Sequence, residues 1–364
     1  MKKRNLIFLI SVFLLITVLC GNAAGEDFQP LVPENGDLNI HFLELGNKYT
    51  GDCIYINYGD TDILIDAGSK QSSASTIKAY IDNYIQDDKI EFVIATHAHE
   101  DHIAGFGTTT ATTGILDSYE IGTIIDFPRT NSRTVTYNRY VEARDRAVSR
   151  GTVHYTALQC YNNEDGASRI YDLGGGVKLE ILYNYYYENY DNNENNYSVC
   201  VKIINGEYQY LFTGDLEKKG EDKLVEYYDN LGGLGHCILY KGGHHGSYTS
   251  SNEKLLEAIS PEYVCVCTCA GSTEYSSNPL RCFPSQDFVE RVAPYTDKVY
   301  ITTLVTDFAS GEYLPLNGNI MFNLGDGNVA LTCSNNDLKL KDTEWFLLNR
   351  EMPDAWKQDQ DINQ

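Results

Sequence analysis

A loop rich in metal-binding side chains constrains this chain more than any other stretch. Residues 96–102 read Thr-His-Ala-His-Glu-Asp-His, which places three imidazoles and the Asp101 carboxylate within six positions. The residues before the loop, 91–95, form an apolar run that predicts a buried strand. A strand that ends in a tight loop can direct several side chains at one point, and imidazole with carboxylate suits zinc, manganese or iron. The alternative is a surface loop that is rich in histidine by chance. We favour a metal-binding loop formed by His97, His99, Asp101 and His102.

Two later stretches repeat this arrangement, in which a predicted strand is followed by glycine and then by a metal-binding residue type. A hairpin formed by residues 198–204 and 208–212 leads into T-G-D, which ends at Asp215. A strand at 237–240 leads into the run K-G-G-H-H-G-S, which contains His244, His245 and Ser247. Both stretches are therefore candidates to join the first loop at one site.

The order of the predicted elements indicates an α/β fold with two sheets, each backed by helices. Strands, a helix and a strand occur in the first part of the chain, and the same order returns later. The predicted strands lie at 38–45, 51–59, 61–68, 91–95, 118–126, 152–155, 177–183, 198–204, 208–212, 237–240, 263–268 and 299–302, with a hairpin at 319–331. The predicted helices lie at 72–86, 137–150, 221–228, 255–259 and 287–292. We see no sharp linker between residues 36 and 350, which favours one catalytic domain.

One segment has neither helical nor strand periodicity. Residues 183–196 are rich in tyrosine and asparagine, and we predict a loop there. Its tyrosines could line a substrate groove, or the segment could be a mobile insertion.

The N-terminus has the pattern of a secretory signal. A basic start at residues 1–4 precedes an apolar run at 6–19 and several small residues, which predicts a signal peptide over residues 1–24. The apolar run is too short for a confident membrane span. Cys20 raises a lipoprotein alternative, although Leu19 is a poor residue immediately before a lipidated cysteine. We expect a protein that is secreted or held at the cell surface.

The net charge excludes some classes of partner. The chain has 364 residues and a formal charge of −23, and loss of residues 1–24 removes three cations and leaves −26. Such an acidic surface repels polyanions at long range and argues against a dedicated nucleic-acid-binding module. Bound divalent metals can still supply local positive charge for a phosphodiester substrate.

With these motifs in place, the chain resembles the metallo-β-lactamase-fold hydrolases. It most resembles the extracellular hydrolase domain of ComEC-type competence proteins and their stand-alone secreted relatives. The matching motifs are G-D-C-I-Y-I-N-Y-G from Gly51, I-L-I-D-A-G from Ile63, T-H-A-H-E-D-H-I-A-G from Thr96, N-N-Y-S from Asn195, L-F-T-G-D-L from Leu211 and G-G-H-H-G-S from Gly242. The resemblance implies an αββα sandwich of two mixed sheets flanked by helices. The hydrolase domain would span residues 37–348, followed by a polar C-terminal tail at 349–364.

The resemblance also implies a centre with two divalent metal ions, zinc or manganese. His97 and His99 match ligands of the first ion, Asp101 and His102 match ligands of the second, and Asp215 would bridge both. His244 would complete the ligands of the second ion. In this scheme Asp101 is also the catalytic residue that accepts a proton from the metal-bound water. The candidate substrate contacts are His245, Ser247 and Asn196, with His245 able to take the place of His244 as ligand. Asp66 is expected to fix the loop rather than to touch metal.

Two departures from the family pattern bear on this centre. Most of these enzymes place a third histidine on the first ion, whereas this chain has Asn195-Asn196-Tyr197-Ser198 at the corresponding stretch. We therefore expect weaker binding at the first position and a shift toward harder ions such as manganese, with a single tightly held metal as the alternative. Phe283-Pro284 stands where the ComEC-like pattern often has His-Pro, so an imidazole that faces the substrate is missing.

The sequence thus predicts a secreted metal-dependent hydrolase that uses a metal-activated water. By family analogy its substrate is a small-molecule or nucleic-acid phosphodiester, as in a nuclease. One alternative is a hydrolase of another ester, a lactone or an amide, and another is an extracellular binding module with a vestigial metal site. We expect no transmembrane channel, because no second long apolar segment occurs. The oligomeric state is left open.

Overall fold

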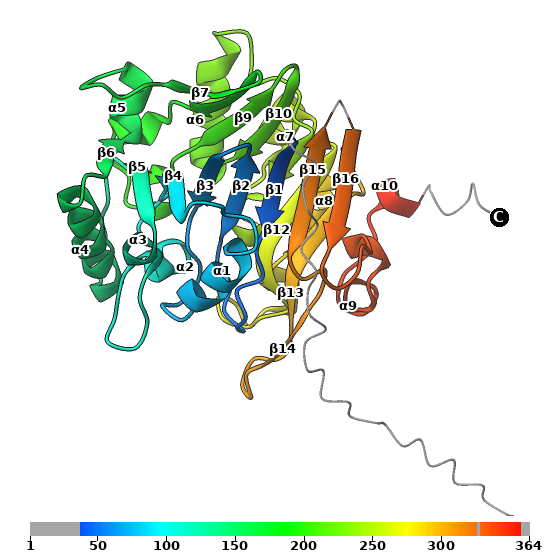
Figure 1. Cartoon of the computed structure of the whole chain (residues 1–364). Helices are drawn as coiled ribbons and strands as arrows, with labels where there is room; N and C mark the ends of the chain where they lie inside the picture. The colour runs from blue at the N-terminus through cyan, green and yellow to red at the C-terminus, as the bar shows by residue number, and fades with distance from the viewer. Residues whose placement is uncertain (1–36, 326–327, 358–364) are drawn as a thin grey trace, which may run out of the picture. The chain divides into compact units, whose positions relative to one another are not determined.

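The strands form two eight-stranded sheets in the computed structural model, which describes residues 37–325 and 328–357 (Figure 1). The first sheet has the order β16-β15-β1-β2-β3-β4-β5-β6, and its strands are parallel from β3 to β6 and antiparallel elsewhere. Its strands are β1 (Leu38–Phe42), β2 (Ile54–Tyr58), β3 (Thr61–Ile65), β4 (Lys89–Ile94), β5 (Glu120–Asp126), β6 (Val153–Thr156), β15 (Ile320–Gly325) and β16 (Asn328–Cys333).

The second sheet is built in the same way. Its order is β14-β13-β12-β11-β10-β9-β8-β7, with parallel pairing from β10 to β13. Its strands are β7 (Ile170–Gly174), β8 (Val177–Ile181), β9 (Val201–Asn205), β10 (Tyr208–Phe212), β11 (Leu239–Lys241), β12 (Tyr263–Ala270), β13 (Val299–Asp307) and β14 (Glu312–Pro315). Each sheet therefore has a parallel half, and the carboxyl ends of these parallel strands carry the loops that matter below.

The two sheets pack face to face and helices cover their outer faces (Figure 1). The Phe42 ring on β1 lies 6.4 Å from the Phe212 ring on β10, and the Tyr263 ring on β12 lies 5.5 Å from the Phe322 ring on β15. Helices α1, α3 and α4 contribute apolar side chains to the core on the first sheet, and α6, α7 and α8 do so on the second. The predicted αββα sandwich of two mixed sheets is confirmed.

The helical elements are short apart from α4 and α6. Those of the first half are α1 (Ser73–Ile81), α2 (Glu100–Ile103), η1 (Ala104–Phe106), α3 (Ile115–Ser118), α4 (Val135–Ser149), α5 (Ala157–Asn162), η2 (Tyr185–Tyr187) and η3 (Glu194–Tyr197). Those of the second half are α6 (Lys218–Asp229), η4 (Gly243–Gly246), α7 (Glu253–Ile259), η5 (Pro279–Arg281), α8 (Gln286–Val292), η6 (Leu340–Asp342), α9 (Glu344–Asn349) and α10 (Asp354–Lys357). In the part of the chain that the structure describes, no helix has the length and apolar character needed to cross a membrane.

Helix α4 shows how the local sequence selects these elements. The Thr134 side chain accepts a hydrogen bond from the Tyr137 backbone N–H and so caps the helix. Tyr140, Ala143 and Ala147 recur every three or four residues, and all three are buried against the first sheet.

The tyrosine- and asparagine-rich segment 183–196 is packed rather than mobile. It contains the short 3₁₀ helices η2 and η3, and the Tyr187 side chain is buried. The Asn184 side-chain amide is also buried and donates to the Ser198 backbone oxygen over 3.0 Å. The prediction of an irregular segment is right. The alternative of a mobile insertion is wrong, because polar side chains of the segment form hydrogen bonds inside the domain.

Packed structure continues beyond residue 348, where we expected a polar tail to begin. The Arg350 guanidinium donates to the Pro284 and Cys282 backbone oxygens, and the Trp356 side chain is buried in the core of the second sheet. The packed domain therefore reaches at least to Lys357. The predicted signal peptide with Cys20 lies outside the described residues, as does the end of the predicted tail.

Candidate metal centre

The candidate site lies where parallel strands of the two sheets end. Strand β3 leads into Asp66, β4 into the loop that holds His97, and β10 into Asp215, while β11 leads into the turn η4. In parallel α/β sheets the carboxyl ends of the strands are where ligands bind. The three stretches that the sequence singled out therefore meet at one place, as their close contacts show.

Four buried side chains converge on one point through their metal-binding atoms. The His102 Nε2 atom lies 3.0 Å from Asp215 Oδ2, and the His245 Nε2 atom lies 3.3 Å from that oxygen and 3.4 Å from Asp101 Oδ2. Nevertheless both Nε2 atoms lack a hydrogen-bond partner. Buried polar atoms are rarely left unpaired. A divalent cation held by Asp101, His102, Asp215 and His245 would satisfy these atoms, so the donor set fits such an ion.

The opposite ring nitrogens of these histidines are held by the protein. The His102 Nδ1 atom lies 2.7 Å from Asp66 Oδ2, and Asp66 in turn accepts hydrogen bonds from the Thr96 backbone N–H and hydroxyl. The His245 Nδ1–H donates to the Cys267 backbone oxygen over 2.9 Å. Such partners fix the ring orientation and leave the Nε2 lone pair for a metal. Asp66 acts through His102 here, as the sequence led us to expect.

Asp52 and Lys241 lie at the candidate centre, and sequence reasoning missed both. Asp52, His102, Asp215 and His245 form a buried group whose ligand atoms lie within 4.8 Å of one another. However, Asp52 faces the Nδ1 sides of both rings, at 3.7 Å from His102 and 3.1 Å from His245, and its carboxylate is ion-paired with Lys241. We therefore place Asp52 behind the metal ligands. The signal was present, because Asp52 is the second residue of one of the matched motifs and Lys241 directly precedes another.

The electrostatics of this group favour a cation. Burial alone would raise the pKa of the Asp52 carboxyl, but the charges of Lys241 and His245 hold it below its ordinary value. Burial likewise opposes ionisation of Asp215, and the neighbouring histidines, His102 first, hold its pKa well below the usual range. Burial disfavours the charged form of His102, yet the Asp215 and Asp66 carboxylates raise its pKa. Dense carboxylate charge thus attracts positive charge to the centre.

A second cluster adjoins the first and opens toward solvent. The His97 Nε2 atom lies 3.0 Å from His99 Nδ1 and 3.9 Å from Asp215 Oδ2, and the His244 Nε2 atom lies 3.8 Å from the same oxygen. The His244 Nδ1 atom is paired with the Thr249 hydroxyl at 3.0 Å. Burial lowers the pKa of both His97 and His244, which favours the neutral imidazole that binds metals.

The doubled histidine adopts an unusual backbone conformation. His244 has φ 45° and His245 has φ 54°, both in the left-handed region that non-glycine residues rarely occupy. Strain of this kind persists where the surrounding structure enforces it, often at functional sites. Its result here is that two consecutive imidazoles from one turn both approach Asp215.

The remaining predicted site residues make contacts that join loops. Asn196 donates to the Asp191 carboxylate over 3.2 Å and accepts from the Glu217 backbone N–H over 3.3 Å. The Ser247 hydroxyl pairs with that of Thr249 at 3.0 Å. From the N-N-Y-S motif it is Ser198 that reaches the centre, because its hydroxyl accepts from the Asp215 backbone N–H and lies 3.5 Å from His97 Nδ1.

Tyr275 is a further residue of the site that the sequence did not indicate. Its hydroxyl donates to Asp101 Oδ2 over 2.7 Å across 174 positions of the chain. Burial and the Asp101 carboxylate raise the pKa of this phenol above its ordinary value, so it stays a hydrogen-bond donor. No local pattern around Tyr275 could reveal a contact of such long range.

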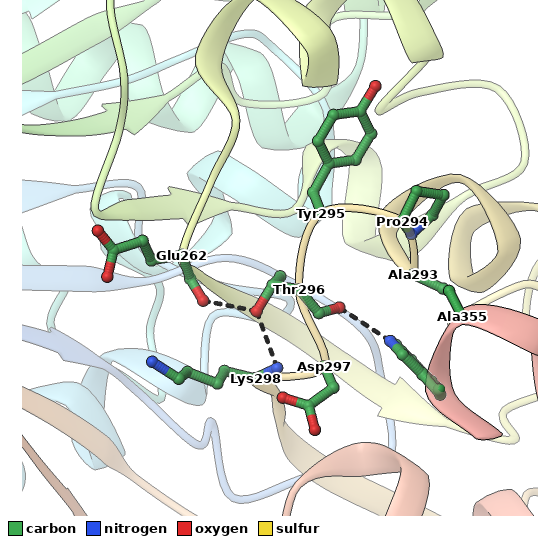
Figure 2. Close-up of a pocket in the computed structure, with 9 residues that line it drawn as sticks. Glu262, Ala293, Pro294, Tyr295, Thr296, Asp297, Lys298 and Ala355 are labelled. Atoms are coloured by element: carbon green, nitrogen blue, oxygen red, sulfur yellow. Dashed lines mark hydrogen bonds between the residues drawn. The ribbon is translucent and has the colours of Figure 1, made fainter. Parts of the chain in front are cut away.

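A cavity of about 640 Å³ lies elsewhere, where α8 ends and α10 begins (Figure 2). Two hydrogen bonds join residues that line it: the Thr296 hydroxyl donates to the Glu262 backbone oxygen, and the Trp356 indole N–H donates to the Thr296 backbone oxygen. None of the residues that line it is a histidine or a cysteine. We therefore place the candidate functional site at the histidine-rich centre.

Comparison with known proteins agrees with this geometry. The model of the metallo-beta-lactamase superfamily matches residues 46–123. Competence protein ComA of Neisseria gonorrhoeae is 34% identical over 154 residues, which are 42% of this chain and 19% of that protein. Recombination protein 2 of Haemophilus influenzae is 25% identical over 244 residues, 66% of this chain and 25% of that protein. Exodeoxyribonuclease YycJ of Bacillus anthracis is 29% identical over 70 residues, 19% of this chain and 26% of that protein. The matched parts thus span about a quarter or less of these relatives.

Proposed function

We propose that this chain, a hydrolase of the metallo-beta-lactamase superfamily, cleaves phosphodiester bonds with a water activated by divalent metal ions. The observation that carries the proposal is the convergence of buried Nε2 and carboxylate atoms from His102, His245, Asp101 and Asp215 on one point. The choice of phosphodiesters is supported by the similarity to a competence protein, a recombination protein and an exodeoxyribonuclease.

The donor geometry supports one assignment of residues to two ions, zinc or manganese. Asp101, His102, Asp215 and His245 would hold the inner ion. His97, His99 and Asp215 would hold the outer ion, together with His244, whose Nε2 atom faces the shared carboxylate. This assignment exchanges the two neighbouring histidines relative to the expectation from sequence, and His244 supplies the imidazole that the N-N-Y-S stretch lacks.

Bound ions would lower the pKa of a water and offset the negative charge that develops on the phosphate. The protein's own contribution is to hold and move a proton at that position. Asp101 is ionised, because the neighbouring His245 and His102 imidazoles depress its pKa against the effect of burial. It can therefore accept the proton of the attacking water. The Tyr275 hydroxyl orients the Asp101 carboxylate for this step.

A substrate panel tests the proposal. Purified protein is loaded with manganese or with zinc and offered single-stranded DNA, duplex DNA, a generic phosphodiester and a lactone, with His99→Ala as control. We expect cleavage of at least one phosphodiester by the wild type and its loss in the variant. Cleavage of the lactone alone would overturn the phosphodiester assignment. Failure of the protein to bind metal would favour a binding module whose metal site is vestigial.

A further inference from the structure

We infer that the rim of the metal centre carries an aromatic platform on which bases of single-stranded nucleic acid stack. The platform consists of Tyr275, Phe283, Tyr248 and Arg281, and we call it the rim platform. The inference rests on the proposed function, because it names the substrate class of the same centre. The inference is supported by ring contacts, by exposed aromatic side chains and by the charges around the site.

The first half of the rim platform is anchored to the candidate catalytic carboxylate. The Tyr275 hydroxyl bonds Asp101, and its ring stacks on Phe283 with centroids 5.4 Å apart and planes inclined by 25°. Phe283 in turn lies 5.8 Å from the His244 ring and 6.1 Å from the His245 ring. Phe283 is buried, whereas Tyr275 is 51% exposed. An aromatic surface in contact with solvent thus sits directly beside the reacting position.

The second half pairs an exposed aromatic ring with a cation. The Arg281 guanidinium lies 4.6 Å from the centroid of the Tyr248 ring, which is 42% exposed. Tyr248 follows the turn that holds the two histidines, and Arg281 is two residues before Phe283. The Tyr248 backbone is fixed by Arg291, which donates to its carbonyl oxygen over 3.1 Å. Two loops of the metal centre therefore present this pair.

A similar pair lies on the loop side of Asp101. The Lys70 ammonium lies 4.4 Å from the centroid of the Tyr49 ring and 3.2 Å from the carboxylate of Glu100, the residue before Asp101. Cations therefore stand beside aromatic rings on two segments that border the centre. Aromatic rings interleaved with basic side chains are how proteins hold single strands without reading their sequence.

The charge of the whole chain makes local stacking the better source of affinity. A formal charge of −23 repels a polyanion at long range, so the strand cannot be captured by a general electrostatic field. Stacking on an aromatic side chain contributes about 1–3 kcal/mol per base and does not depend on charge. Bases inside a duplex are already stacked on one another and cannot reach the platform. The platform therefore favours single strands over duplexes.

The test compares oligonucleotides that differ only in their bases. A single strand of ordinary nucleotides and a strand of equal length made of abasic residues are cleaved by the manganese-loaded protein, in both deoxyribose and ribose forms. We expect KM to be higher for the abasic strand by about 5- to 150-fold, the ratio that corresponds to one stacked base. Tyr248→Ala should raise KM for the ordinary strand about tenfold, change kcat little and leave the abasic strand unaffected.

A matched variant and a binding measurement complete the test. Tyr185→Ala is the control, because Tyr185 is 38% exposed and lies under Lys223 of α6 rather than on a loop of the centre. Fluorescence anisotropy of a labelled strand in EDTA measures binding independently of hydrolysis. Equal affinity of the wild type for ordinary and abasic strands would overturn the platform even if the enzyme cleaves both. If no phosphodiester is cleaved but ordinary strands still bind more tightly than abasic ones, the platform stands and the proposed function fails.

Discussion

Lys241 and Asp52 form an ion pair that is buried directly behind the metal centre, with each side chain only 1% exposed. Asp52 Oδ1 lies 3.1 Å from His245 Nδ1, and the Lys241 ammonium lies 3.6 Å from Asp215 Oδ1. The pair thus touches two of the candidate ligands from the side away from the proposed inner ion. A buried ion pair seldom stabilises a fold more than apolar residues of similar volume would. Its value here is to position His245 and Asp215.

Removing one member of this pair should lower the free energy of unfolding strongly, whereas neutralising both members should lower it little. Lys241→Met leaves the Asp52 carboxylate buried without its cation, and we expect the free energy of unfolding to fall by about 3–5 kcal/mol. The double variant Lys241→Met with Asp52→Asn should recover most of this loss, although metal affinity should stay reduced because His245 loses its charged neighbour. Urea unfolding and metal titration measure the two effects. A single variant as stable as the wild type would contradict this account of the pair.

The two neighbouring histidines should differ in metal binding. His245→Ala removes a fully buried Nε2 donor and should abolish the tighter binding event, whereas His244→Ala should weaken only the looser one. Calorimetric titration with manganese and zinc separates these outcomes without any substrate. His236→Ala is the control, because His236 is exposed and pairs with Glu262. Loss of the tighter event in His244→Ala alone would reverse the assignment.

Removing a ligand of either the inner or the outer ion should stop hydrolysis and leave the fold in place. We expect His97→Ala and Asp215→Ala to reduce phosphodiester cleavage to the background rate, since each variant removes a group that holds metal. EDTA should have the same effect, reversed by added manganese. Circular dichroism checks that the variants are folded. Activity retained in both variants would rule out this centre as the active site.

Protonation of His41 on unfolding should account for part of the stability that the protein loses in acid. Burial lowers the pKa of His41 to about 3, although its hydrogen bond to Asn57 acts in the opposite direction. The unfolded chain binds a proton at this group near pH 6.5, so the stability contribution is complete above pH 6.5 and is lost as the pH falls toward 3. At pH 5 the loss should be about 2 kcal/mol.

The variant His41→Gln isolates this contribution. Glutamine keeps an acceptor for the Tyr80 hydroxyl and a donor for Asn57 Oδ1, which the imidazole now provides. Urea unfolding at pH 8 and pH 5 should show a smaller difference between the two pH values in the variant, by about 2 kcal/mol. Equal differences in the two proteins would show that His41 does not titrate during acid unfolding.

The parts of the fold that rest on local pattern were predictable. Alternating and apolar runs marked most of the strands, among them β1 to β5, and a three- to four-residue period marked α1. The edge strands β7 and β14 were missed because their side chains are largely exposed, so burial leaves no periodic mark on their sequence. The segment 183–196 looked mobile because its order comes from buried hydrogen bonds to distant residues.

For the candidate site, the sequence by itself determined which residue types were available and that they follow strands. His97, His99, Asp101 and His102 lie within one loop, so their proximity is a consequence of covalent geometry. Only the tertiary structure decided that Asp52, Lys241 and Tyr275 join them, because these residues come from separate strands and loops that meet when two sheets pack. It also decided the roles of His244 and His245, since a left-handed turn, which no residue pattern specified, sets which ring enters the core.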